Sequence, residues 1–151
     1  LEEYWKRVDV KNKSSILVAF ILLAVSCYHH RRSNFNGAYK TIRKAKKIFT
    51  ENQHLIFNYG IDVKKLFPLI ESIEKKIHEG KPYESVSLPI HDDKLIHLCK
   101  VRSEQLHFVW NRSSDLSDPH LIHRHKMRDR TDVILERKKA LEQRKGKGLS
   151  Q

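Results

Sequence analysis

The chain has 151 residues, of which 39% are hydrophobic, and a formal net charge of +12 at pH 7. This length suits one domain with an appended segment, and the apolar content fills one compact core rather than two. The positive excess favours an acidic partner, and two cysteines without a CxxC spacing argue against a disulfide framework or a zinc knuckle. We expect a cytoplasmic protein without a cofactor or a bound metal.

The first expected elements are two helices joined by a polar turn at 9–13. Residues 1–7 are expected to form the end of a helix, with Trp5 as its apolar anchor, and residues 15–32 to form a longer helix. The uncharged run in the longer helix, 14–28, is shorter than the ~20 residues that a membrane-spanning helix needs. We therefore predict a buried central helix that is apolar on all sides, and no membrane span.

The stretch YHHRRSNFNGA, residues 28–38, gathers polar side chains where the long helix ends. His29, His30 and two arginines suit the negative end of the helix dipole, and Asn34 suits the left-handed turn after it. Gly37 and Ala38 are small, so the next helix can approach closely. The two helices are predicted to form an antiparallel hairpin that resembles a single tetratricopeptide-like unit.

The helix expected over 37–51 has two opposite faces. Its apolar stripe follows helical spacing at Ala38, Ile42, Ala45 and Phe49. Four cations occupy the other face with the same periodicity, namely Lys40, Arg43, Lys44 and Lys47. Together with Arg124 and Arg128 near the C-terminus, these cations are candidates for contacts with phosphate groups.

Three further helices are expected, over 63–79, 93–108 and about 119–145. The second has apolar side chains along one side, and the third is strongly basic. Residues 83–89 are expected to be extended. We therefore predict a helical-bundle core at 1–82, an extended linker at 83–92 and a C-terminal helical extension at 93–151.

Three passages carry a family resemblance: LEEYW at 1–5, YHHRRSNFNGAYKTIRKA at 28–45, and the segment from LSDPHLIHRH onward. The chain resembles a family of small bacterial proteins known as domain of unknown function 309, in its Firmicutes form with a C-terminal extension. The resemblance implies an all-α, compact bundle of about five helices and no established activity. It also implies that the His-Glu start of the family motif HExLExxW lies before Leu1, so that this chain is N-terminally incomplete.

The family usually has glycine before the asparagine of the turn, where this chain has Ser33. We therefore expect the left-handed residue to be Asn34, or the turn to be strained.

The histidines also suggest a polar site between the first two helices, formed by Glu2, Trp5, His29 and His30. A carboxylate–histidine pair can act as a general acid or base, but such a pair more often fixes helix register. No phosphate loop, GxSxG elbow or HExxH sequence is present, and we assign no catalytic residue.

The leading prediction is a non-enzymatic protein-interaction module that binds a partner protein or a second copy of itself. The first alternative is a nucleic-acid-associated basic module. The second alternative is a hydrolase or metal-dependent enzyme that uses the Glu/His site.

Overall fold

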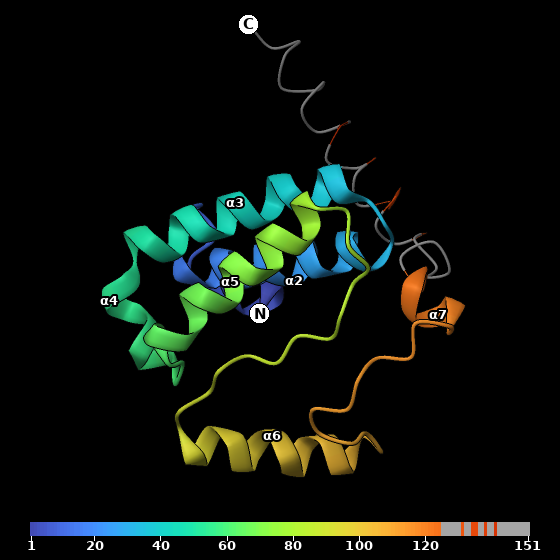
Figure 1. Cartoon of the computed structure of the whole chain (residues 1–151). Helices are drawn as coiled ribbons and strands as arrows, with labels where there is room; N and C mark the ends of the chain where they lie inside the picture. The colour runs from blue at the N-terminus through green and yellow to red at the C-terminus, as the bar shows by residue number, and fades with distance from the viewer. Residues whose placement is uncertain (125–130, 132–133, 136–137, 139–140, 142–151) are drawn as a thin grey trace, which may run out of the picture. The chain divides into compact units, whose positions relative to one another are not determined.

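The computed structural model describes residues 1–124, 131, 134–135, 138 and 141, and it divides the chain into two units, Leu1–Leu116 and Ser117–Gln151. The first unit is built from α1 (Glu2–Val8), α2 (Ile16–Arg31), α3 (Phe35–Glu51), α4 (Gln53–Ile56), the 3₁₀ helix η1 (Phe57–Tyr59), α5 (Val63–His78) and α6 (Asp93–Gln105) (Figure 1). The second contains α7 (Pro119–Ile122). The predicted all-α fold class is confirmed.

Helix α2 is the apolar helix that the sequence predicts, and it packs against α3 and α1. Ser15 caps it by accepting a hydrogen bond from the Leu17 amide, and its apolar side chains line the core. The exposed surface of α2 is small because neighbouring elements cover most of its sides. Within the described residues, every helix is too short or too polar to cross a bilayer.

The closest helix contact is between α2 and α3. Ala38 and Ala45 of α3 are fully buried, and the buried Ser26 hydroxyl of α2 donates a 2.8 Å hydrogen bond to the Ala38 carbonyl. Phe49 fills the core below them and meets Phe20 edge to face, with ring centroids 5.0 Å apart. The core face of α3 also packs against α5, so that α3 contacts both α2 and α5 (Figure 1).

The turn between α2 and α3 is a Schellman motif, a C-terminal cap closed by two backbone hydrogen bonds. The Asn34 amide donates to the His29 carbonyl at 2.9 Å, and the Ser33 amide donates to the His30 carbonyl at 2.9 Å. Ser33 takes the left-handed conformation, with φ of 56°, whereas Asn34 has φ of −85°. Asn34 is instead the N-cap of α3, where its Oδ1 accepts a 3.0 Å hydrogen bond from the Gly37 amide. Of the two outcomes expected for this turn, the structure shows the strained one.

We expect Ser33→Gly to raise the free energy of unfolding by about 0.5–1 kcal/mol, because glycine removes the steric cost of a β-carbon at positive φ. The gain is smaller than that full cost, because glycine also makes the unfolded chain more flexible. Urea unfolding followed by circular dichroism measures the change. Ser33→Ala is the control: it keeps the β-carbon and should give no gain. Equal stabilisation by both substitutions would contradict this account of the turn.

The segment after α5 returns along the bundle before α6 begins. Residues 81–89 have no regular secondary structure. An isolated antiparallel bridge then pairs Ile61 with Ile90, and the His91 amide donates to the Gly60 carbonyl at 2.8 Å. A β-carbon on Gly60 would lie 3.0 Å from Leu95, so the first turn of α6 is held close to this bridge.

The C-terminal unit is described only in part. Asp118 caps α7 by accepting a hydrogen bond from the His120 amide. Most of the predicted basic helix over 119–145 lies outside the described residues. The predicted domain division at 83–92 stays a prediction.

Candidate functional site

Glu2 and Trp5 make their contacts within α1 and with the loop that leads to α2. Glu2 forms a 2.8 Å ion pair with Lys6, and the hydrogen bond from Lys6 lowers the pKa of the Glu2 carboxyl. The Trp5 indole donates to the Asn12 carbonyl at 3.2 Å, and the Lys13 ammonium lies 4.4 Å from its ring centroid. At ~1.5 Å per residue, α1 is about 10 Å long and α2 about 24 Å, so α1 can lie along less than half of α2.

His29 and His30 make separate contacts at the end of α2. The Asn34 side-chain amide donates to His29 Nδ1 at 3.1 Å, which adds a side-chain link to the Schellman turn. His30 is 3% exposed, and its Nε2 donates to the Lys81 carbonyl at 2.8 Å. Neither histidine contacts Glu2 or Trp5, so the structure does not assemble the four residues into one site.

We call the end of α2 with His29, His30 and Arg31 the histidine corner. Its side chains contact the chain that follows α5. The edge of the Tyr83 ring meets His30 with centroids 5.6 Å apart, and the Arg31 guanidinium lies 5.0 Å from the centre of the same ring. Lys76 and Glu84 form an ion pair beside them. The polar stretch YHHRR therefore fixes residues 81–84 to the end of α2.

Thiol and metal chemistry are the other possibilities within the described residues. Burial raises the pKa of the Cys27 thiol, which keeps it protonated and unreactive. In the described part of the chain, no three His, Cys, Asp or Glu side chains gather around a point where a metal ion could bind.

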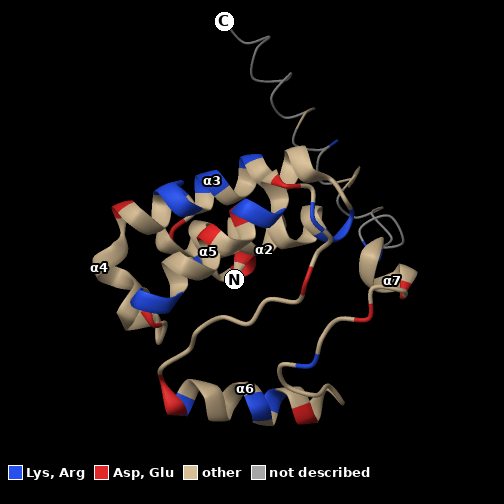
Figure 2. Ribbon diagram, in the orientation of Figure 1, with Lys and Arg blue, Asp and Glu red and all other residues tan. Residues whose placement is uncertain are grey.

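The predicted cations of α3 do share an exposed face. Lys40, Arg43, Lys44 and Lys47 are all exposed, and Figure 2 shows several Lys and Arg segments along α3. Lys47 pairs with Glu51 at 3.8 Å, and Arg43 stacks over the Tyr39 ring at 5.7 Å. Lys40, Arg43 and Lys44 form no ion pair with an acid in residues 1–124.

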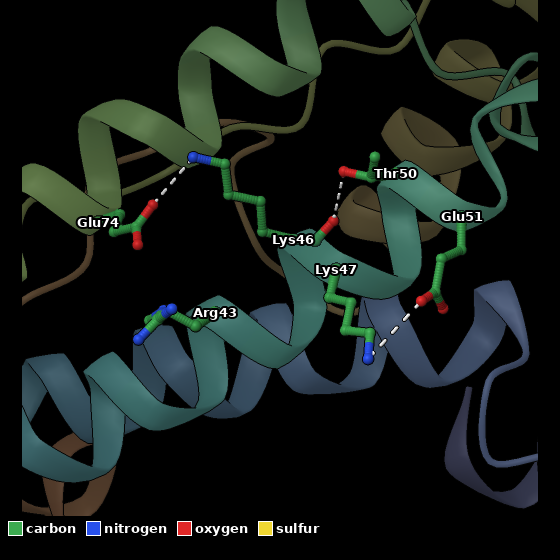
Figure 3. Close-up of a pocket in the computed structure, with 6 residues that line it drawn as sticks. All are labelled: Arg43, Lys46, Lys47, Thr50, Glu51 and Glu74. Atoms are coloured by element: carbon green, nitrogen blue, oxygen red, sulfur yellow. Dashed lines mark hydrogen bonds and ion pairs between the residues drawn. The ribbon is translucent and has the colours of Figure 1, made fainter.

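A shallow groove of about 440 Å³ lies between α3 and α5 (Figure 3), lined by Arg43, Lys46, Lys47, Thr50, Glu51 and Glu74. Lys46 reaches across it to Glu74 at 3.1 Å and to Glu71 at 3.4 Å. The hydrogen bond to Glu74 raises the pKa of Lys46, so the lysine stays charged and bound to its partners. Three cations and two carboxylates line the groove. The acids hold Lys46 and Lys47, whereas Arg43 has no acidic partner in residues 1–124.

The two other candidates for phosphate contacts, Arg124 and Arg128, lie in the C-terminal unit. Arg124 is exposed. Arg128 lies outside the described residues.

A second surface lies on α6, and it is apolar. The sequence predicts apolar side chains along one side of this helix, but no residue of α6 is buried. Leu98, within the helix, is 63% exposed. Just after the helix, Leu106 is 48% exposed, Phe108 69% and Val109 67%. All of these except Val109 line a shallow groove of about 300 Å³, whose full lining is Leu98, Cys99, Arg102, Ser103, Leu106, Phe108 and Trp110.

A left-handed turn gives this groove its far wall. His107 has φ of 59°, and the Phe108 amide donates to the Ser103 carbonyl at 2.8 Å, so α6 ends earlier than residue 108. Phe108 and Trp110 thus leave the helix and stand beside it. Sequence reasoning missed these two aromatic residues; the apolar cluster LHFVW at 106–110, directly before a polar loop, was the available signal.

The fold and these surfaces define a class: an all-α protein that presents one basic and one apolar face, with no catalytic constellation among the residues described. A family model described as Domain of unknown function (DUF309) matches residues 1–41. The chain is 39% identical over 145 residues to "Uncharacterized protein YpuF" of Bacillus subtilis (strain 168), an alignment that covers 96% of this chain and 83% of that protein. The chain belongs to the DUF309 family. No solved structure matches it significantly.

Proposed function

We propose that this protein is a non-enzymatic interaction module whose α6 surface binds an acidic, amphipathic segment of another protein. The observation that carries the proposal is the apolar face of α6, none of whose residues is buried. Monomeric proteins rarely expose contiguous apolar patches, and such patches usually mark interaction sites. Aromatic side chains such as Phe108 and Trp110 are also typical anchors of protein interfaces.

The positive charges beside the α6 groove indicate which kind of partner it binds. Arg102 alone is charged among the described residues that line the groove, and Lys94 lies one helical turn before Leu98 on the same side. A partner with acidic side chains around its apolar anchors complements these cations. A second copy of the chain is disfavoured, because it repeats the same cations and carries the same formal charge of +12.

A synthetic helical peptide tests the proposal, with leucines at i, i+4 and i+7 and glutamates on both flanks. We expect it to bind the full chain, as measured by fluorescence anisotropy of a labelled peptide. Leu98→Ser should weaken binding by about tenfold or more, since losing a central apolar anchor commonly costs over 1 kcal/mol. Leu88→Ser is the matched control, because Leu88 is also exposed but lies outside the groove.

Two control peptides separate the contributions of charge and apolar contact. Lysine in place of glutamate, or serine in place of leucine, should each abolish binding. Equal binding of all peptides, or equal affinities of Leu98→Ser and the parent chain, would contradict the proposal. Sedimentation of the protein alone gives a further outcome: concentration-dependent dimerisation that Leu98→Ser removes would assign the surface to a second copy instead.

A further inference from the structure

We propose that the exposed face of α3 binds the phosphate backbone of double-stranded DNA without reading its sequence. This surface is separate from the α6 groove, and the inference does not depend on the function proposed for α6. The contacts come from Lys40, Arg43 and Lys44, the three exposed cations of this face that have no acidic partner in residues 1–124.

Acidic side chains are absent from a long part of the sequence around this face. Residues 10–50, which contain α2 and all of α3 except its last residue, Glu51, hold nine lysines and arginines and no aspartate or glutamate. The described ion pairs of these cations are those of Lys46 with Glu71 and Glu74 and of Lys47 with Glu51. Because α3 carries no acid between Phe35 and Thr50, its free cations Lys40, Arg43 and Lys44 keep a positive potential, which is what a phosphate backbone requires.

The α3 face lacks the apolar groups that a protein partner or a membrane would contact. Between residues 11 and 56, all of which the structure describes, no large hydrophobic side chain is exposed. A protein interface usually has an apolar core, and an interfacial membrane helix inserts apolar side chains among the lipids. A charged and hydrated face without apolar groups fits a nucleic-acid backbone better than either.

The α3 face suits a DNA duplex better than a single strand, because it offers no free aromatic ring. Proteins that bind single strands stack bases on exposed aromatic rings. On this face the candidate ring is Tyr39, but the Arg43 guanidinium lies over it at 5.7 Å and the His78 ring packs at 5.9 Å. The ring is therefore occupied, and the higher density of phosphates on a duplex gives the stronger contact.

The test is the salt dependence of binding to a labelled DNA duplex of arbitrary sequence, measured by anisotropy with the full chain. The triple variant Lys40→Gln, Arg43→Gln, Lys44→Gln should bind about tenfold or more weakly near 0.1 M salt. Its slope of log K against log salt should be shallower by about 3, since each phosphate contact contributes roughly 0.9. Glutamine is a good helix former, so circular dichroism should show unchanged helix content.

The matched control, Lys65→Gln, Lys75→Gln, Lys81→Gln, removes the same charge at positions that pair with Asp62 and Glu79. It should change the slope by less than about 1. Equal losses in the two triple variants, or no loss in either, would overturn the proposal, because net charge or another basic segment would then explain the binding. Stronger binding to a single strand of the same length, or to anionic phospholipid vesicles, would also overturn it.

Discussion

Phe49→Ala is expected to lower the free energy of unfolding by about 3–5 kcal/mol, the range for deleting a fully buried aromatic side chain. Phe49 has no exposed surface and lies on the core face of α3, where its ring meets Phe20. The substitution therefore leaves a cavity between α2 and α3, the closest pair of helices in the bundle. Urea unfolding at low temperature measures the loss, and a variant that is unfolded in buffer also fulfils the expectation, given total stabilities of about 5–15 kcal/mol.

Phe57 provides the control for this substitution. It is 63% exposed and stacks on His91 with ring centroids 4.2 Å apart. Phe57→Ala should cost less than about 1 kcal/mol, because it loses one ring contact and creates no cavity. Similar losses for both phenylalanines would contradict the position of the core described above.

His30→Ala is expected to cost about 2–4 kcal/mol, because it removes a buried ring and leaves the Lys81 carbonyl without its donor. His30→Phe keeps the ring volume and removes the N–H group, so it should cost about 1–2 kcal/mol. The difference between the two variants separates packing from hydrogen bonding at this corner.

The adjacent histidine is the matched control. His29 is half-buried and accepts one hydrogen bond, from the exposed Asn34 amide. We expect His29→Ala to cost at most about 1 kcal/mol. If the two alanine variants were equally stable, the view that His30 fixes residues 81–84 to α2 would be wrong.

Local features of the fold follow from local sequence. Ser15, Asn34 and Asp62 cap the helices that they precede, because side-chain oxygens there satisfy free amides of the first turn. The exposed cations of α3 also follow directly from its period, since an apolar stripe fixes which side chains face away from the core.

The features of the fold that could not be predicted from the sequence depend on contacts between residues far apart in the chain. The partner of His30 is Lys81, 51 residues away, and nothing in the local pattern indicates it. The apolar period of α6 identifies one side of the helix but does not say whether another element covers it. The turn at Ser33 shows a third limit: the hydrogen-bond pattern of the Schellman motif places the left-handed residue, and there it overrides the preference of asparagine for that conformation.

The central claim is that this protein acts by contact through α6, while the histidine corner is structural. Both statements are tested by mapping the binding site of the acidic peptide on the full, ¹⁵N-labelled chain by nuclear magnetic resonance. We predict amide shift changes concentrated in residues 98–110, with His29 and His30 unchanged. Shift changes centred on 28–38, with α6 unaffected, would contradict the account.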